Sequence, residues 1–324
     1  MKKVLIVGGG VSGLICSYVF KKYRNVNVKI IEAEQVGGEF LAGGLKYIHR
    51  TDEMVSMFVD MDLVFSNYTV RGGIMLKETV QPYPACFQNM EKEKAERIQA
   101  DHYRKTRLAE PGAHAKKAMN DPASTKPRKA LRTDFEVMIR ELAKRADVIR
   151  GCLQRVERNH VYLASGQVIP YDYLVLTIPL WIIRKCVNWY VPHGVAMRLN
   201  VIKVVPKRDK YARWDYVYTP YTPADAVHRF SPQGAGYAVE VNGDLDHSKL
   251  QSDLSFIFDE GWYIKNVKEG LKGHLLPLEQ ETEWPENIAP LGRFAKWDSR
   301  STMDVALRDS VELAERWLNG RQVE

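Results

Sequence analysis

The residue types best suited to chemistry stand near the start of the chain, where residues 8–13 read GGGVSG directly after the apolar run 4–7. In such a turn Gly8 permits the tight reversal, Gly10 lets a pyrophosphate approach the backbone, and Gly13 lets the next helix pack closely on the strand. That helix would begin at Val11 and Ser12, where backbone N–H groups and the positive end of the helix dipole face the phosphates. The spacing therefore predicts a dinucleotide-binding turn.

An acidic residue follows at the distance that such a turn requires. Glu32 stands nineteen residues after the last glycine of the turn, at the end of a second apolar run. A carboxylate there is placed to accept hydrogen bonds from ribose hydroxyls. Ala33 comes directly after it, and the pair Gly37 and Gly38 indicates a backbone segment close to the cofactor, as does Gly44. Strand, turn, helix, strand and acid thus occur in the order of a nucleotide-binding unit.

Hydrophobic periodicity predicts the elements that position these residues. Residues 52–62 and 134–146 carry apolar side chains at helical spacing, and Asp134 offers a cap for the second helix. Residues 67–84 predict strands around a turn at 71–73, which contains two glycines.

The second half of the chain predicts further sheets. Residues 147–178 form a short meander whose last strand, 173–177, is almost wholly apolar, as a central parallel strand should be. Residues 195–265 alternate apolar with polar or aromatic residues and predict a second sheet that forms the wall of a substrate pocket. Gly292 then opens onto a helix from about residue 305, which would bring a second helix dipole onto the same cofactor.

Length and composition limit the class of protein. With 324 residues, 45% of them hydrophobic, the chain can bury a large core, and its length suggests about two domains. No stretch approaches the roughly 18 to 20 apolar residues of a membrane helix, and the first strand follows Met1 too closely to leave room for a signal peptide. The four cysteines form no CxxC pair, so we expect neither a disulfide framework nor a metal site, and a reducing cytoplasm is the expected compartment.

The positive charge is concentrated in one segment. The formal net charge is +7, and residues 101–132 hold nine Lys or Arg against three acidic residues. Residues 87–107 have helical spacing, and prolines then interrupt the pattern, which predicts a helical insertion with a basic tip. Residues 104–132 could contact the phosphates of a nucleotide or of DNA, or they could form only a solvated face.

Four separated segments together resemble one family. They are the turn with Glu32 and the glycine pair, the segment 44–49 (GLKYIH), the strand that closes on Thr177, and the stretch 292–304. On these segments the chain resembles the FAD-dependent amine oxidase superfamily, in particular its UDP-galactopyranose mutase-like branch. The last stretch is similar to the C-terminal segment whose backbone contacts the flavin and the pyrophosphate in that family.

The resemblance implies an α/β fold with FAD as the cofactor. A discontinuous Rossmann-type FAD-binding domain would comprise residues 1–85, 134–190 and 285–324, with a basic helical insertion at 86–133 and a mixed-sheet substrate domain at 191–284. Glu39 stands where oxidases of this group usually carry Arg. The cofactor contacts that the turn and the resemblance predict are Gly8, Gly10, Val11, Ser12, Gly13, Glu32, Ala33, Gly37, Gly38, Gly44, Leu153, Thr177, Gly292, Arg293, Met303 and Asp304.

Three residues are candidates for the substrate side. His49 lies in the mutase-like segment and would stand beside the flavin ring or serve as a structural histidine. Arg229 lies in a stretch similar to the one that brings an arginine to the substrate in the mutases, and its guanidinium could bind a carboxylate or phosphate in a forked geometry. Trp297 is a further candidate for the same pocket.

These observations leave three functions open. The first is an oxidase that acts on a C–N bond of an amine or amino-acid group, which an aromatic pocket would favour in its neutral form. In one version of it, the amine is carried on a nucleotide or on DNA, as in phage-type base hypermodification. The second is a mutase-like isomerase that works with reduced flavin. The third is a binding protein with a basic arm, with or without flavin. The sequence predicts neither the substrate nor the oligomeric state.

Overall fold

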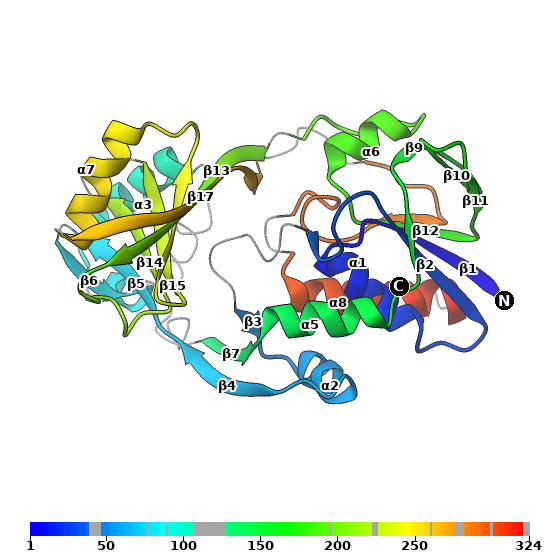
Figure 1. The fold of residues 1–324 in the computed structure, drawn as a ribbon, viewed down its shortest axis with the longest axis horizontal. Helices are drawn as coiled ribbons and strands as arrows, with labels where there is room; N and C mark the ends of the chain where they lie inside the picture. The colour runs from blue at the N-terminus through cyan, green and yellow to red at the C-terminus, as the bar shows by residue number, and fades with distance from the viewer. Residues whose placement is uncertain are drawn as a thin grey trace.

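The computed structural model describes residues 1–38, 47–76, 78–88, 90–106, 128–194, 196–221, 226–259, 261–275, 282–298 and 301–319. Within them the chain forms two lobes, one built on a parallel sheet and the other on a mostly antiparallel sheet. A small three-stranded sheet connects the lobes (Figure 1). No helix in these ranges is long and apolar enough to cross a membrane.

The first lobe is organised around a five-stranded parallel sheet. Its strand order is β18-β12-β1-β2-β8, and every neighbouring pair is parallel. The strands are β1 (Lys2–Val7), β2 (Val26–Glu32), β8 (Val148–Arg150), β12 (Tyr173–Leu176) and β18 (Ile288–Pro290). The apolar run that ends at Thr177 is thus an internal strand of this sheet, with a neighbour on each side. Its side chains are apolar because both faces of the sheet are covered. The predicted Rossmann-type architecture is confirmed.

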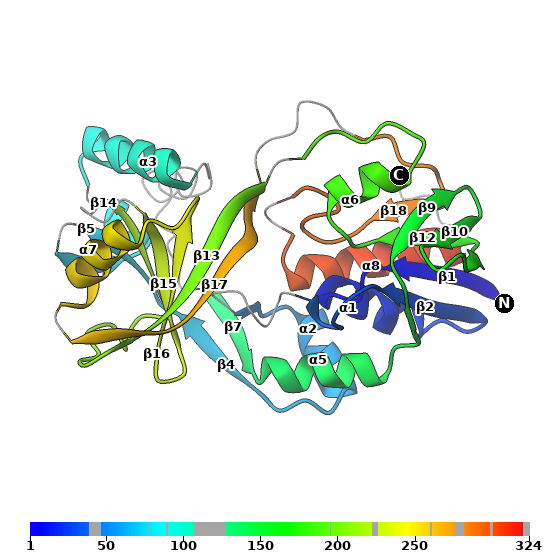
Figure 2. The same cartoon turned by 45° about the horizontal axis from the view of Figure 1, so that its top comes forward.

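Different elements cover the two faces of this sheet, as Figure 2 shows. One face buries its apolar side chains against the helices α1 (Val11–Phe20), α2 (Asp52–Asp60), α5 (Phe135–Lys144) and α8 (Met303–Asn319). The other face packs against α6 (Leu180–Cys186) and a small antiparallel sheet of β9 (Leu153–Glu157), β10 (His160–Leu163) and β11 (Val168–Pro170).

The two helices predicted from periodicity begin at capping residues. The carboxylate of Asp134 accepts hydrogen bonds from the N–H groups of Glu136 and Val137, and the hydroxyl of Thr51 accepts one from Met54. Each cap satisfies backbone donors that have no partner within the helix. Both helices are confirmed, with α5 beginning at Phe135.

The second lobe contains a seven-stranded sheet in the order β17-β13-β16-β15-β14-β5-β6. Its strands are β5 (Gly72–Leu76), β6 (Thr79–Pro82), β13 (Ala196–Pro206), β14 (Tyr216–Tyr221), β15 (Val227–Gln233), β16 (Gly236–Asn242) and β17 (Trp262–Leu275). Helix α7 (His247–Phe258) packs on one face of the sheet. Helix α3 (Lys92–Thr106) and the short 3-10 turn η2 (Ala85–Phe87) pack on the other.

The turn predicted at residues 71–73 is wrong. Strand β4 (Phe65–Val70) pairs with β7 (Arg128–Thr133), whereas β5 pairs with β14 and β6, so the chain passes from one sheet to another at Arg71. The glycines serve a different purpose: a Cβ at Gly72 would lie 2.4 Å from the hydroxyl of Tyr216. They make room for a neighbouring ring inside the strand instead of forming a turn.

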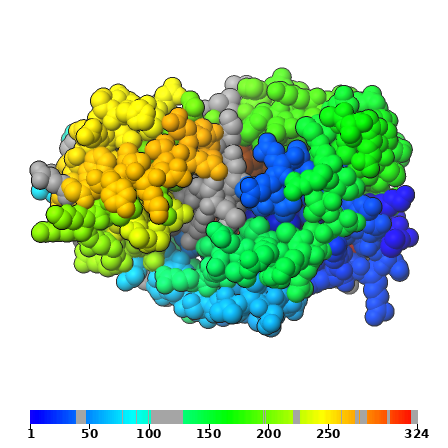
Figure 3. Space-filling model, in the orientation of Figure 1, coloured from blue at the N-terminus to red at the C-terminus, as the bar shows by residue number. Residues whose placement is uncertain are grey.

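Strand pairing also changes two of the predicted domain boundaries. Strands β5 and β6, at residues 72–76 and 79–82, lie in the seven-stranded sheet, outside the parallel sheet with which they were grouped. Residues 128–133, predicted to end the helical insertion, form β7, which pairs with β4 and with β3 (Ile48–His49) in the connecting sheet. In Figure 3 the cyan and green atoms along the lower edge include this connection. Gly44, Glu39 and the basic tip at 107–127 lie outside the described residues.

Candidate functional site

The glycine turn has the backbone geometry that a nucleotide-binding turn requires. Gly8 has a φ of +110°, and a Cβ at Gly13 would lie 1.9 Å from the carbonyl oxygen of Gly8, so the helix packs too closely on the strand for any other residue. The hydroxyl of Thr177 donates to the carbonyl oxygens of Val7 and Gly8 at 3.0 and 2.9 Å. Thr177 therefore supports the turn from the neighbouring strand.

Gly10 differs from the other glycines of the turn because it faces open space. A Cβ at Gly10 would meet no atom of the described chain within 4 Å. The N–H of Gly37 donates to the carbonyl oxygen of Gly9 at 2.8 Å, and a Cβ at Gly38 would lie 3.6 Å from the Cα of Gly10. The glycine pair thus borders the start of α1, where no described side chain caps the helix.

The predicted ribose acid lies beside the turn. The carboxylate of Glu32 accepts hydrogen bonds from the N–H groups of Gly9 at 2.5 Å and Glu34 at 2.7 Å. The N–H of Gly151 donates to the Glu32 carbonyl at 3.1 Å, which brings the segment leading into Leu153 next to the end of β2. The arrangement fits a dinucleotide whose ribose lies at Glu32 and whose pyrophosphate lies over Gly10.

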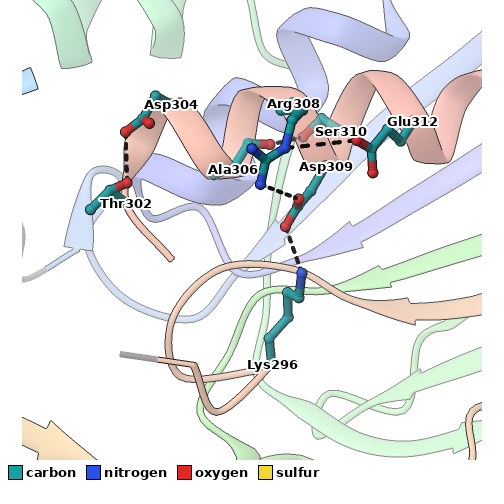
Figure 4. Close-up of polar contacts among 8 residues, drawn as sticks. All are labelled: Lys296, Thr302, Asp304, Ala306, Arg308, Asp309, Ser310 and Glu312. Atoms are coloured by element: carbon teal, nitrogen blue, oxygen red, sulfur yellow. Dashed lines mark hydrogen bonds and ion pairs between the residues drawn. The ribbon is translucent and has the colours of Figure 1, made fainter. Parts of the chain in front are cut away.

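The C-terminal segment reaches the same place. Gly292 has a φ of +84°, and a Cβ there would lie 2.5 Å from the hydroxyl of Ser12 at the start of α1. Figure 4 shows how the loop that follows is held, with the amine of Lys296 directed at Asp309 of α8 at 2.7 Å. Gly292 therefore meets the glycine turn at Ser12, with Arg293 half-buried in the loop that follows.

A histidine and a carboxylate meet at the start of α8. Nδ1 of His49 lies 3.4 Å from Oδ1 of Asp304, which also accepts a hydrogen bond from the Thr302 hydroxyl at 2.6 Å. Burial raises the pKa of Asp304, but the hydrogen bonds from His49 and Thr302 outweigh it and lower the pKa below 3.8. An ionised Asp304 therefore holds the His49 ring by one nitrogen. Met303, buried at the helix start, packs into the first lobe.

This carboxylate gives a pH-dependent stability. Because the folded-state pKa of Asp304 is lowered, its contribution is fully present above its ordinary pKa and is lost as the pH falls through the folded value. We expect Asp304→Asn to lower the free energy of unfolding by about 1 kcal/mol at pH 7. Urea unfolding from pH 7 to pH 2 should show the difference shrinking below pH 4. A difference that stays constant down to pH 2 would contradict the contact.

The register of the connecting sheet places His49 in a row of side chains. His49 pairs with Ala130 of β7, which pairs with Tyr68 of β4, so the three share one face. Arg128 and Arg132 lie on the same face, two residues to either side of Ala130, because side chains alternate along a strand. The guanidinium of Arg132 lies 4.5 Å from the Tyr68 ring centroid.

Tyrosines gather where this row approaches the seven-stranded sheet. Tyr216 and Tyr218 stand two residues apart on β14. The ring of Tyr47 stacks on that of Tyr216 with the centroids 6.4 Å apart, and it is tilted against the ring of His49 with the centroids 5.3 Å apart. We call the five rings that gather here the tyrosine cluster; they are Tyr47, Tyr68, Tyr83, Tyr216 and Tyr218. The cluster extends from His49 onto the second lobe.

Four members of the tyrosine cluster are held in their neutral form by burial. Burial is the largest cause in each resolved case: it raises the pKa of Tyr68 to about 12 and those of Tyr83, Tyr216 and Tyr218 above their ordinary value. The phenol hydroxyls therefore act as neutral donors and acceptors in an apolar setting.

The structure gives Arg229 a carboxylate partner, and its anion-binding role stays a prediction. A single guanidinium nitrogen of Arg229 donates to both carboxylate oxygens of Glu240, at 2.7 and 2.6 Å, and the Glu240 side chain is only 2% exposed. The charge of Arg229 is thus largely neutralised by a buried carboxylate. The guanidinium of Arg229 also lies 5.7 Å from the ring centroid of Tyr218, so the ion pair with Glu240 borders the tyrosine cluster.

Trp297 has a packing role. Its ring is 8% exposed and lies 5.9 Å from the Trp181 ring in an edge-on arrangement, within the apolar cluster that includes α6. A Cβ at Gly194 would lie 2.6 Å from the ring. We expect Gly194→Ala to overpack this contact and cost about 1 to 3 kcal/mol in urea unfolding. An unchanged free energy of unfolding would show that the ring can move aside.

Four residues of the site were not predicted from the sequence. Tyr47, Tyr68 and Tyr83 stand outside the aromatic segment 195–265, so alternation gave no signal for them. Glu240 had a signal, because it is the one acidic residue in the apolar strand GYAVEVN. A lone carboxylate in such a strand indicates a buried partner.

Comparison with known proteins shows the fold. No protein-family model matches the chain, and no curated protein matches it. Among solved structures, a reduced UDP-galactopyranose mutase matches with a TM-score of 0.70 and 13% identity, over 99% of this chain and 94% of the mutase. A fatty acid isomerase from P. acnes matches with a TM-score of 0.67 and 13% identity, over 98% of this chain and 99% of the isomerase. A putrescine oxidase variant matches with a TM-score of 0.63 and 12% identity, over 99% of each chain. The fold that the sequence resemblance implied is confirmed.

Proposed function

We propose that this chain, which shares its fold with a mutase, an isomerase and an oxidase, is an FAD-dependent oxidoreductase that acts on a C–N bond of an amine or amino-acid group. The observation that carries the proposal is the approach of the segment at Gly292 to the glycine turn, where Gly292 lies against Ser12 and Gly10 faces open space. An NAD-dependent enzyme has no need for a cofactor segment in its last residues.

The described residues fit FAD. The pyrophosphate would lie at the start of α1 over Gly10, the adenosine ribose at Glu32, and the C-terminal segment from Gly292 to Asp304 would approach the cofactor from the other side. When bound, FAD would accept the hydride. The protein would orient the substrate against the cofactor and set the electrostatic environment of the reaction.

The substrate side would be formed by His49 and the tyrosine cluster. Buried neutral phenols penalise a charged ammonium, so an amine held there is favoured in the neutral form from which hydride can leave. Asp304 holds Nδ1 of His49, which leaves Nε2 as the nitrogen able to accept the proton that the ammonium releases. His49 would thus prepare the substrate, and Asp304 would orient His49.

An anaerobic titration tests this reaction. Purified protein that contains FAD is mixed with primary amines, polyamines and amino acids under argon, and the loss of flavin absorbance is followed. We expect at least one amine class to bleach the flavin and His49→Ala to slow the bleaching while FAD stays bound. Bleaching by none of them, with turnover of a nucleotide sugar only after dithionite reduction, would replace the oxidase by the isomerase.

A flavin-dependent isomerase is the second candidate function. The structures of the mutase and of the fatty acid isomerase match this chain with TM-scores of 0.70 and 0.67. In that function the same cofactor site would hold reduced flavin, and no net oxidation would occur. A colourless protein that takes up no FAD would instead favour a binding protein with a basic arm.

We further propose that the amine is carried on a nucleotide or on DNA. Lys129 of β7 is exposed and belongs to the basic segment 104–132. We expect Lys126→Ala combined with Lys129→Ala to reduce the slope of log affinity against log salt by about 0.9 per lost phosphate contact. Fluorescence anisotropy with a labelled duplex measures the slope. The pair Lys265→Ala and Lys268→Ala, on exposed positions of β17, serves as the control, and salt-independent turnover of a free amine would contradict the DNA version.

A further inference from the structure

Two cysteines that are far apart in the sequence meet on the far side of the parallel sheet. Cys152 precedes β9 and Cys186 ends α6, and the sulfur atoms of both lie 3.8 Å from the same oxygen, the carbonyl of Leu153. The two sulfurs are therefore within twice that distance of each other. Cys16 is fully buried in the helix layer and Cys86 belongs to a cluster of the second lobe.

The surroundings suit thiol chemistry in two steps. Cys152 is exposed, whereas Cys186 is 7% exposed and lines a cavity of about 550 Å³ together with Lys185, Gln154 and Asn188. Burial, and next the neighbouring Cys152 thiol, raise the pKa of Cys186, while Lys185 lowers it, and the raised pKa disfavours a direct attack of Cys186 on an oxidant. The exposed thiol is thus the one that an oxidant reaches first, and the buried thiol is the one that resolves it.

We propose that Cys152 and Cys186 form a peroxide-oxidisable dithiol that closes to an intramolecular disulfide. The Cys152 sulfur attacks one peroxide oxygen, the O–O bond breaks, and a sulfenic acid forms with release of one water. The Cys186 sulfur then attacks the Cys152 sulfur, the S–OH bond breaks, and a second water leaves. Two thiols are oxidised, one peroxide is reduced to two waters, and a disulfide remains.

The bridge would join two elements that flank the predicted adenosine end of the cofactor site. Leu153 lies between the sulfurs, and the N–H of Gly151 is bonded to the carbonyl of Glu32. The disulfide would join the start of β9 to the end of α6. It would also lower the conformational entropy of the unfolded chain between the two cysteines. We therefore expect the oxidised protein to melt at a higher temperature than the reduced one.

Mass spectrometry tests the proposal on the whole protein. After treatment with a small excess of hydrogen peroxide, we expect an intact mass about 2 Da lower, which dithiothreitol reverses. Trypsin without reductant should release residues 151–155 joined to residues 186–198. Cys152→Ser and Cys186→Ser should each abolish the joined peptide, and Cys86→Ser should retain it.

Other outcomes overturn the proposal. They are a stable addition of oxygen to Cys152 with no joined peptide, a peroxide-dependent dimer linked through Cys152, or thiols that resist peroxide. If either serine variant fails to fold, thiol counting on the wild-type protein before and after peroxide still decides, because the proposal requires the loss of two thiols per chain. None of these readouts depends on flavin content or on the proposed oxidase reaction.

Discussion

Gly10→Ala is expected to weaken FAD binding about 100-fold, so that FAD is lost during purification, while the folded protein stays intact. Gly10 has φ −68° and ψ 178°, which any residue adopts, and its Cβ would meet no described atom within 4 Å. The added methyl group would instead occupy the space over the start of α1. A pyrophosphate held away from the backbone loses charge-assisted hydrogen bonds, each worth about 1.5 to 3 kcal/mol, so binding should weaken about 100-fold.

Gly243→Ala is the matched control for this variant. Its Cβ also meets no atom within 4 Å, but its φ of +76° strains any other residue. It should keep FAD and lose about 1 to 2 kcal/mol of stability, whereas Gly10→Ala should lose FAD and keep the stability of the flavin-free protein. FAD titration and urea unfolding of both variants separate the two effects. Normal FAD binding by Gly10→Ala would place the pyrophosphate elsewhere.

Glu240→Leu is expected to destabilise the protein by about 3 to 5 kcal/mol, because it leaves a buried guanidinium without its carboxylate. The pair is nearly enclosed, with the side chains of Arg229 and Glu240 exposed by 19% and 2%. His228 Nε2 also lies 3.8 Å from Glu240, so the loss affects a second polar group. Urea unfolding at pH 7 measures the change.

The double variant Arg229→Met with Glu240→Leu distinguishes a charge effect from a packing effect. Replacing both members of a buried ion pair with apolar residues is often nearly neutral, so the double variant should recover most of the loss. Because Arg229 is paired with Glu240, Arg229→Met should also change substrate affinity less than the loss of an arginine that binds the substrate directly. A single Glu240→Leu variant that loses less than about 1 kcal/mol would contradict the neutralised pair.

The cofactor half of the site was predictable because its requirements are local. A turn in which Gly8 has a positive φ and Gly13 contacts backbone can be filled only by glycine, so the sequence carries the signal directly. The distant Gly292 entered through the resemblance, and the structure brings it onto Ser12. The contacts of single residues with FAD stay predictions.

The substrate half was less predictable because it depends on register between distant strands. Tyr216, Tyr218 and Arg229 share a face only because β14 pairs with β5 on one side and with β15 on the other. The glycines at 72 and 73 looked like a turn, since a pattern of two glycines does not distinguish a reversal from close packing against a ring. The pairing of Arg229 with Glu240 could not be read from the segment around Arg229, because Glu240 lies on the next strand.

The most direct test of the account is the visible absorbance spectrum of the purified protein, followed by identification of any released chromophore after heat denaturation. The account predicts flavin bands and the release of FAD in a ratio approaching one per chain, with the Gly10→Ala variant colourless under the same preparation. A wild-type protein that is folded, shows no flavin bands and takes up no added FAD would contradict it.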